Sequence, residues 1–391
     1  MRAVLTILAL WCAGLGAAAQ FGKISILYQD LALHYAGAGA LGVGFMVSVV
    51  GLVGLIFGTT AGLVVARVGA RRAILWALAL GAVVSVVQGF LPPYPVMMAT
   101  RVLEGASHLT IVVVGPTVIA SVASVRMQGA AMTLWSSFFA MTYAILAFIA
   151  PALVASGGDK ALFWGHAGWM LACLGVLSVL MPRDIVPVAR PDRGSLWTQH
   201  VQIYASPRLA APAMGFVCYT VTYVALLTLL PPVMTPGWGG FAAVAMPLAS
   251  ISVSLTLGVW LLARVSAVHM VQAGFAVGIV ASLMLWVLWG TGAAEAAAAL
   301  LLAAALGIVQ GASFAALAQL NAGTDNRARA AGAIAQLGNL GTTTGTPLLA
   351  LILPSTGVTG LALFAAAFCA LGIAVHELQA ARRKRIAVMP N

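Results

Sequence analysis

Charged side chains are scarce in this sequence. Only 7% of its 391 residues are charged, whereas 62% are hydrophobic. A soluble domain is about one quarter charged, and a disordered chain is poor in hydrophobic residues, so the composition excludes both classes. The apolar residues form long runs and do not alternate with polar ones, which argues against a transmembrane β-barrel. The composition therefore predicts a membrane protein that crosses the bilayer several times as helices.

Cysteine is also rare. The four cysteines all lie within apolar runs, and none has the paired spacing of a metal site or a disulfide framework. We interpret them as small buried apolar residues and expect no metal, no disulfide and no cofactor. Their positions are Cys12, Cys173, Cys218 and Cys369.

Twelve apolar runs are each long enough for a helix to cross the hydrocarbon core, which takes about 20 residues. The longest polar stretch, residues 183–208, divides the runs six and six. We therefore predict an all-α polytopic membrane protein of twelve transmembrane helices: an N-terminal six-helix bundle (1–182), a cytoplasmic linker (183–208), a C-terminal six-helix bundle (209–378) and a basic cytoplasmic tail (379–391). The runs cover residues 4–27, 38–63, 73–91, 95–122, 128–154, 163–182, 209–233, 241–263, 269–289, 294–320, 330–353 and 358–378.

The basic residues predict the orientation. The net charge is +11, and the lysines and arginines lie mainly between the apolar runs and not on one face of a helix. With a cytoplasmic N-terminus, 16 of these 19 residues fall on the cytoplasmic side, and Lys160 alone lies in an outside loop. Cytoplasmic loops of membrane proteins carry such an excess. We therefore expect the inner membrane of a bacterium-like cell, both termini in the cytoplasm, and no nucleic-acid partner.

The first 20 residues leave a second topology open. A basic residue, an apolar stretch and Ala17-Ala18-Ala19 imitate a cleavable signal peptide. Cleavage would leave eleven runs and would invert the charge bias of every loop. Because the apolar run contains Trp11 and continues past Gln20 to Ile26, we favour a retained first helix.

The two halves of the chain resemble each other. Four short matches occur in the same order, at offsets between 197 and 206 residues. Because each half has an even number of runs, both halves enter the membrane from the same side. This predicts a parallel repeat about an axis along the membrane normal. The matches pair residues 66–70 with 263–267, 104–107 with 310–313, 126–130 with 329–333, and Pro151 with Pro354.

Two motifs support a family resemblance. The connection between the second and third runs contains Gly62, Arg67, Gly69, Arg71 and Arg72, although Ala66 stands where an acidic residue is usual. The fourth run contains an arginine followed by a glycine, in residues 101–105. With these motifs, the whole chain resembles the major facilitator superfamily. The motif of drug/proton antiporters in the fifth helix is present only as Ala150-Pro151.

The resemblance implies a secondary transporter with alternating access and not an enzyme. The chain has no nucleotide-binding P-loop, so transport driven by its own ATP hydrolysis is excluded. The resemblance also implies that Gly62, Arg67, Gly69, Arg71 and Arg72 form a cytoplasmic gate. A second interpretation is that these arginines only set the topology.

Three ionisable residues share one face of the fourth run. Arg101, Glu104 and His108 are spaced i, i+3 and i+7. Charges within spans are costly, and they often mark transport pathways. We predict that Glu104 carries a proton, that His108 relays it, and that Arg101 binds an anion once Glu104 is protonated. The alternative is an Arg–Glu pair that only locks the helix in place.

Further polar residues within the runs are candidates for binding substrate. Lys23 either faces a central cavity or extends to the outer membrane surface. Four residues near the outer ends of runs are expected to be solvated: Asp30, His34, His166 and Glu295. The predicted substrate-binding residues are Gln20, Lys23, Arg101, Trp135, Tyr143, Tyr219, Tyr223, Gln310, Gln336 and Asn339.

These observations predict a monomeric transporter in the lipid bilayer. We expect proton-coupled uptake of a small organic solute that is anionic or zwitterionic. Two alternatives stay open: proton-driven efflux of drugs or metabolites, and a non-transporting membrane sensor or assembly factor.

Overall fold

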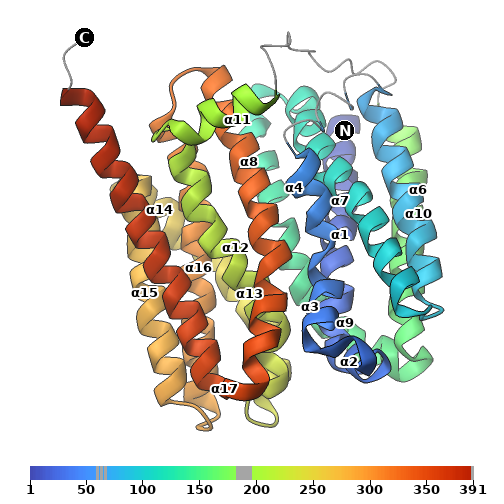
Figure 1. Ribbon diagram of the computed structural model, residues 1–391. Helices are drawn as coiled ribbons and strands as arrows, with labels where there is room; N and C mark the ends of the chain where they lie inside the picture. Colours follow the sequence, from blue (N-terminus) through green and yellow to red (C-terminus); the bar gives the residue numbers. More distant parts are fainter. Residues whose placement is uncertain (59–60, 62–64, 66–67, 182–195, 389–391) are drawn as a thin grey trace. The chain divides into compact units, whose positions relative to one another are not determined.

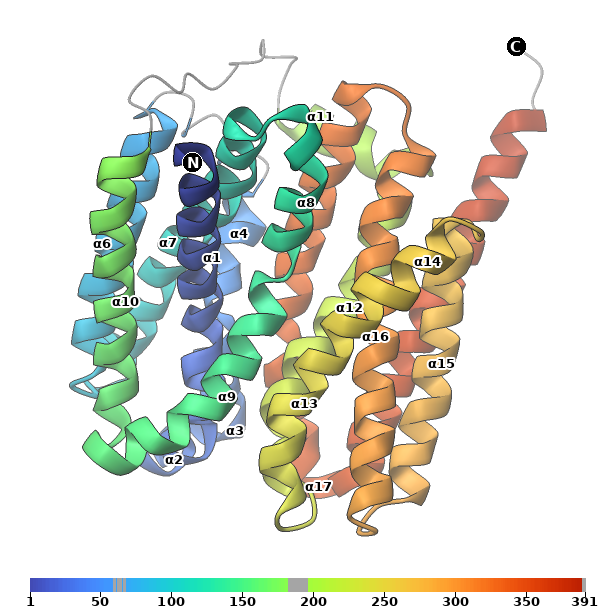
Figure 2. The same cartoon turned by 180° about the vertical axis from the view of Figure 1, so that it is seen from behind.

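The computed structural model describes residues 1–58, 61, 65, 68–181 and 196–388, and helices make up most of them (Figures 1 and 2). The chain divides into two compact units, Met1–Arg190 and Pro191–Asn391. Gly62 and Arg67 lie outside the described residues, and so do residues 182–195, which include the first half of the polar stretch 183–208.

The first unit contains the helices of the N-terminal half. Their bounds are α1 (Arg2–Ile26), α2 (Tyr28–His34), the short 3-10 helix η1 (Ala36–Ala38), α3 (Gly39–Ser48), α4 (Val50–Phe57), α6 (Ala70–Gln88), α7 (Tyr94–Val122), α8 (Val125–Ser136), α9 (Phe138–Gly157) and α10 (Asp159–Leu180).

The second unit contains the helices of the C-terminal half. Their bounds are α11 (Leu196–Ala205), α12 (Ala210–Leu229), η2 (Pro231–Val233), α13 (Trp238–Val253), the π-helical turn η3 (Ser254–Gly258), α14 (Val259–Leu262), α15 (Ala267–Val287), α16 (Ala293–Leu320) and α17 (Thr324–Val388).

The apolar helices agree with the predicted runs. Within the described residues, ten helices are long and apolar enough to cross a membrane, and the bent pair Tyr28–His34 and Ala36–Ser48 is an eleventh candidate. The last of the ten, α17, covers both the eleventh and the twelfth predicted runs. Gly357 divides it into two helices, because its φ of 58° lies in the left-handed region that glycine tolerates. The predicted all-α polytopic fold is confirmed.

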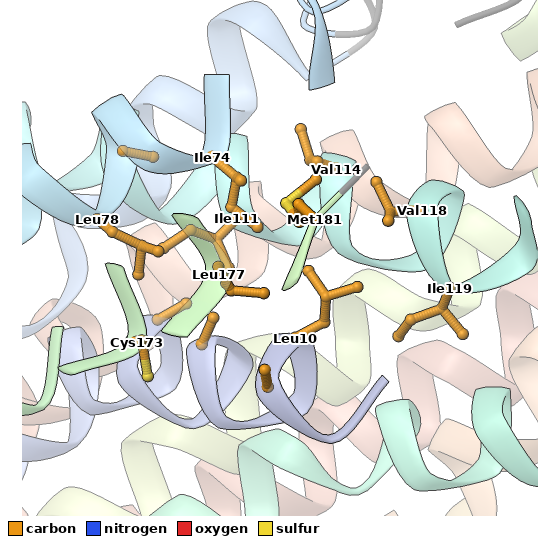
Figure 3. Close-up of a cluster of buried hydrophobic side chains, with 14 of the residues drawn as sticks. Leu10, Ile74, Leu78, Ile111, Val114, Val118, Ile119, Cys173, Leu177 and Met181 are labelled. Carbon is orange, nitrogen blue, oxygen red and sulfur yellow. The ribbon is translucent and has the colours of Figure 1, made fainter. Parts of the chain in front are cut away.

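An apolar core packs between helices α1, α6, α7 and α10 of the first unit (Figure 3). It includes Leu10 of α1, Leu78 of α6, Ile111 of α7 and Leu177 of α10, all essentially inaccessible to solvent. Because α1 contributes residues from its N-terminal half to this core, its C-terminal half is left to line a different part of the unit. Polar side chains gather there.

Helices approach each other closely at two glycines that the repeat relates. A Cβ atom on Gly105 of α7 would lie 2.5 Å from the Val50 carbonyl oxygen of α4. A Cβ atom on Gly311 of α16 would lie 2.7 Å from the Ser254 hydroxyl. Small residues permit this packing of transmembrane helices. At Gly105 the neighbour is a backbone carbonyl group, whereas at Gly311 it is a side-chain hydroxyl.

Candidate functional site

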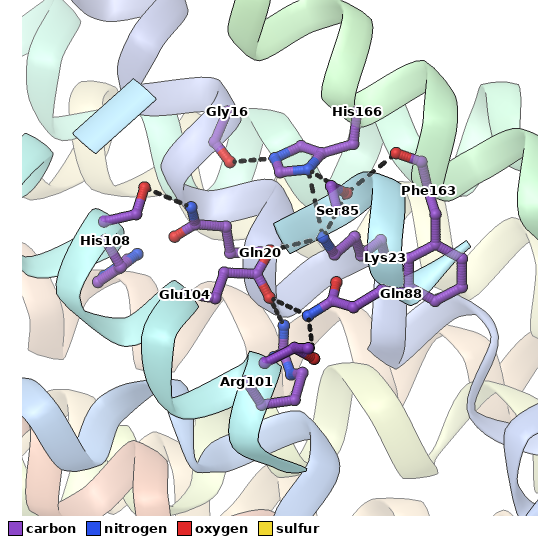
Figure 4. Close-up of polar contacts among 12 residues, drawn as sticks. Gly16, Gln20, Lys23, Ser85, Gln88, Arg101, Glu104, His108, Phe163 and His166 are labelled. Carbon is purple, nitrogen blue, oxygen red and sulfur yellow. Dashed lines mark hydrogen bonds and ion pairs between the residues drawn. The ribbon is translucent and has the colours of Figure 1, made fainter. Parts of the chain in front are cut away.

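Three charged side chains lie fully buried inside the first unit. Lys23 of α1 and both Arg101 and Glu104 of α7 have 0% of their surface exposed. Figure 4 shows them meeting between α1, α6, α7 and α10. Buried charges in a membrane segment are costly and require partners. The hydrogen bonds of the cluster supply those partners.

Glu104 is the centre of this cluster. Its Oε1 accepts a hydrogen bond from Lys23 Nζ at 2.5 Å, and its Oε2 accepts one from Arg101 Nη1. Gln88 of α6 donates a further bond from Nε2 to Oε2 at 2.9 Å. Two cations therefore share one carboxylate, so these three charged groups together carry a net positive charge.

Backbone carbonyl groups satisfy the rest of Arg101. Its Nε donates to the Met46 carbonyl at 2.7 Å, and its Nη2 donates to the Val47 carbonyl at 3.1 Å. Both carbonyls lie near the C-terminal end of α3, where the helix dipole offers partial negative charge. The guanidinium thus connects Glu104 to α3, and these protein groups occupy all three of its nitrogen atoms.

Lys23 is also saturated by protein groups. Besides Glu104, its ammonium donates to Ser85 Oγ at 2.8 Å and lies 3.2 Å from His166 Nδ1. The ammonium also lies 5.4 Å from the centre of the Phe163 ring. The interpretation that Lys23 extends to the outer surface is wrong, because the side chain is fully buried and points into the cluster.

His166 of α10 was expected to be solvated, and the structure corrects this. The residue is 6% exposed. Its Nε2 lies 2.9 Å from the Gly16 carbonyl, and its Nδ1 lies 2.9 Å from Ser85 Oγ. A carbonyl only accepts hydrogen bonds, so Nε2 carries a proton. The helix α10 thus brings a second ionisable group to the lysine.

His108 takes a different position from the one expected. Its Nδ1 lies 2.9 Å from the Ala17 carbonyl, and its ring packs edge-on against Phe21. None of the hydrogen bonds between described residues joins it to Glu104. The predicted face of α7 therefore brings Arg101 and Glu104 into contact, while His108 points toward α1.

The remaining candidates of the first unit are dispersed. Gln20 lies at the edge of the cluster and donates to Ser107 Oγ at 2.9 Å. Tyr143 pairs with Ser25 at 3.1 Å. Trp135 belongs to the apolar core and packs 4.9 Å from the Phe138 ring. Of these three, the structure places only Gln20 beside the charged residues.

The candidates of the second unit do not form one cluster. Tyr219 and Tyr223 stack on each other along α12, with ring centres 5.1 Å apart. Gln336 binds α11, because its Oε1 accepts from Tyr204 at 2.9 Å and its Nε2 lies 3.1 Å from His200. The other two lie on separate helices: Gln310 is half-buried on α16, and Asn339 donates to a carbonyl of its own helix, α17.

The predicted gate is described only in part, because Gly62 and Arg67 lie outside the described residues. Gly69 directly precedes α6 and has a φ of 90°. Arg71 Nη2 donates to the Ser178 carbonyl near the C-terminal end of α10 at 2.5 Å, while Arg72 is exposed. Arg71 thus binds the end of a neighbouring helix, where a cation is favourable.

Glu295 is a second correction to the expected solvated residues. It is fully buried, and it accepts hydrogen bonds from the Thr235 hydroxyl at 2.5 Å and from the backbone N–H of Gly290 at 3.2 Å. It therefore ties two loops of the second unit together. Asp30 and His34 are exposed, as expected.

Sequence reasoning missed Ser85 and Gln88 of α6. Ser85 accepts a hydrogen bond from the Lys23 ammonium, and Gln88 donates a hydrogen bond to the Glu104 carboxylate. A signal was present, because the two residues are three apart and therefore share one face of a helix whose other polar residues, Arg71 and Arg72, lie in its first turn.

A family model described as Major Facilitator Superfamily matches residues 6–346. A search of curated proteins returned no match to the chain.

Proposed function

Because the chain belongs to the major facilitator superfamily, we propose that it is a proton-coupled secondary transporter in which Glu104 carries the proton. The solute is a small organic anion or zwitterion, and the inward proton gradient drives its uptake. The halves of such transporters alternately expose a binding site to the two sides of the membrane.

The observation that carries this proposal is a carboxylate buried between two cations. Glu104 receives Lys23 from α1, Arg101 from α7 and Gln88 from α6. A proton on Glu104 would remove the negative charge that holds both cations. The contact between α1 and α7 would then lose most of its electrostatic attraction, which gives the proton a direct effect on helix packing.

The surroundings of Glu104 suit the protonated form as well as the charged one. Gln88 donates to Glu104 through Nε2, and its Oε1 is buried without a hydrogen-bond partner in the described part of the chain. Rotation of the amide by half a turn would present that oxygen to a carboxyl O–H. The same residue can therefore satisfy both protonation states without a change in the backbone.

The charge balance supports an anionic or zwitterionic solute. Two cations share one carboxylate while Glu104 is ionised, and neither has a carboxylate partner once it is protonated. Once Glu104 is neutral, Lys23 and Arg101 would attract a negatively charged group of the solute in its place. Protonation of Glu104 would therefore raise the affinity for an anionic solute, and binding of the solute would favour protonation.

A thermal-shift screen followed by transport measurements tests this proposal. The panel contains lactate, succinate, citrate and the proteinogenic amino acids, and the compound that most raises the Tm of the purified protein is the probe. Proteoliposomes that contain the protein are then given an inward proton gradient. Wild-type protein is expected to accumulate the probe, and Glu104→Gln is expected to lose this accumulation.

Counterflow of the same probe is the matched measurement, because exchange requires no net movement of protons. Glu104→Gln is expected to keep counterflow, since a permanently neutral side chain imitates the protonated form. Full proton-driven accumulation by Glu104→Gln would contradict the assignment of the proton to this residue. If the inward proton gradient instead drives the probe out of the proteoliposomes, this result would favour export over uptake.

A further inference from the structure

His166 occupies a central position in the polar cluster, and the proposed function does not use it. Its Nδ1 lies 3.2 Å from Lys23 Nζ and 2.9 Å from Ser85 Oγ, and its Nε2 lies 2.9 Å from the Gly16 carbonyl (Figure 4). Both ring nitrogens therefore have partners. The identities of these partners determine which protons the ring can hold.

The neutral form of His166 has one tautomer that fits. The Gly16 carbonyl requires a proton on Nε2, so Nδ1 is left as an acceptor. Lys23 donates two of its protons to Glu104 and Ser85. Its third proton is free to point at Nδ1. In this state a lysine ammonium donates directly to the bare nitrogen of an imidazole.

The doubly protonated form fits equally well. Ser85 donates its single proton to the Phe163 carbonyl at 2.9 Å, so its oxygen has room to accept a bond from a proton on Nδ1. The Gly16 carbonyl continues to accept from Nε2. The ring can therefore gain a proton without losing a partner and without moving.

The charged groups that face His166 come from two helices. Lys23 is on α1, and Glu104 and Arg101 are on α7; the neighbouring helix α6 contributes the uncharged Ser85 and Gln88. The protonation of His166 is therefore linked to the same carboxylate that the proposed function makes the proton carrier.

We propose that His166 accepts the proton of Lys23 when Glu104 is protonated, so that Glu104, Lys23 and His166 form a proton path across α7, α1 and α10. This inference rests on the proposed function. A proton binds Glu104 and removes the counter-charge of Lys23. The Nζ–H bond of Lys23 then breaks, and a new bond forms between that proton and Nδ1 of His166. Lys23 becomes a neutral amine and His166 an imidazolium, and the total charge is unchanged by the transfer.

Nuclear magnetic resonance of protein with ¹⁵N-labelled histidine rings tests this proposal without any solute. Signals are assigned by their loss in His166→Gln and in His108→Gln. In wild-type protein at neutral pH, His166 is expected as the neutral Nε2–H tautomer, whereas the Ala17 carbonyl holds a proton on Nδ1 of His108. In Glu104→Gln, which imitates the protonated acid, His166 is expected as an imidazolium. A neutral His166 in that variant would overturn the proposal.

Transport measurements separate a proton path from a structural role. A glutamine at position 166 can donate to Gly16 and accept from Lys23, but it cannot take up a proton. We expect His166→Gln to keep counterflow of the panel probe while its proton-driven accumulation falls about 100-fold. His269→Gln, at an exposed residue of the second unit, controls for the substitution itself.

The outcomes distinguish this inference from the proposed function. Normal accumulation by His166→Gln, with loss in Glu104→Gln, would overturn the proton path alone. Normal accumulation by both variants would overturn the proposed function too. Normal accumulation by His166→Gln, with loss in His166→Ala, would assign His166 a structural role and would also overturn the path.

Discussion

At the scale of single residues, Lys23 and Glu104 contribute unequally to the cluster, although they form one ion pair. Glu104 forms ion pairs with two cations, whereas Lys23 has one carboxylate partner, which also pairs with Arg101. Removal of Glu104 leaves two buried cations without a counter-charge. Removal of Lys23 leaves a neutral pair. The two substitutions should therefore differ in their effect on stability.

We predict that Glu104→Gln destabilises the protein more than Lys23→Met does. Loss of one partner from a buried ion pair costs about 3–5 kcal/mol, and this full cost is expected only for Glu104→Gln. Thermal unfolding of the purified variants in one detergent measures the difference. An equal or larger decrease in Tm for Lys23→Met would show that Arg101 does not share the carboxylate.

The sequence allowed part of this cluster to be predicted, for a physical reason. Arg101 and Glu104 are separated by one helical turn, so the local geometry of α7 is enough to bring them together. His166 lies more than 60 residues from Glu104 along the chain. Only the packing of α10 against α1 and α6 decides that this histidine, and not His108, contacts Lys23.

At the scale of the helices, the close approach of α4 and α7 depends on the missing side chain of Gly105. A Cβ atom there would meet the backbone of Val50, which cannot move as a side chain can. We predict that Gly105→Ala destabilises the protein by about 1–3 kcal/mol. Gly165 of α10 is the control, because a Cβ atom added there meets nothing within 4 Å.

Thermal unfolding of the two alanine variants tests this packing. The Gly165→Ala variant is expected to be at least as stable as the wild type, because alanine favours a helix over glycine by about 1 kcal/mol. Equal stability of the Gly105→Ala and Gly165→Ala variants would contradict the close approach of α4 and α7.

The helix α11 is attached to α17 by a hydrogen bond from Tyr204 to Gln336. Burial raises the pKa of Tyr204 to about 12, above the ordinary tyrosine pKa of about 10. A raised pKa of an acid stabilises the fold below the unfolded pKa, and this contribution is lost as the pH rises through the folded pKa. The contribution of this residue to stability should therefore be complete up to about pH 10.

We predict that Tyr204→Phe lowers stability by about 1 kcal/mol at neutral pH. The difference from wild type should stay constant up to about pH 10 and shrink as the pH approaches 12. Chemical unfolding at several pH values measures it. A difference that is absent at neutral pH would show that the bond does not hold α11.

At the scale of the whole molecule, the sequence predicted the fold almost completely. Hydrophobic runs must become helices in a bilayer, because no water is present there to satisfy backbone groups. The internal breaks were harder to predict. Ser137 separates α8 from α9 inside one predicted run, and α11 forms within the polar stretch. Both depend on contacts between helices, which hydrophobicity does not record.

The distribution of basic residues predicts the topology. A fluorescent protein fused after Arg385 is expected to be fluorescent, and alkaline phosphatase at the same position is expected to be inactive, because both report a cytoplasmic location. The opposite pattern is expected for fusions at Lys160. A reversed result at both positions would contradict the predicted topology.

Glu104 carries the proton in the proposed transport cycle, so its substitution tests proton coupling most directly. The direct test compares wild-type and Glu104→Gln protein in proteoliposomes with an inward proton gradient, using the probe from the solute panel. We predict that wild-type protein accumulates the probe, and that Glu104→Gln exchanges it in counterflow without accumulating it. Accumulation by Glu104→Gln equal to that of wild type would contradict this account.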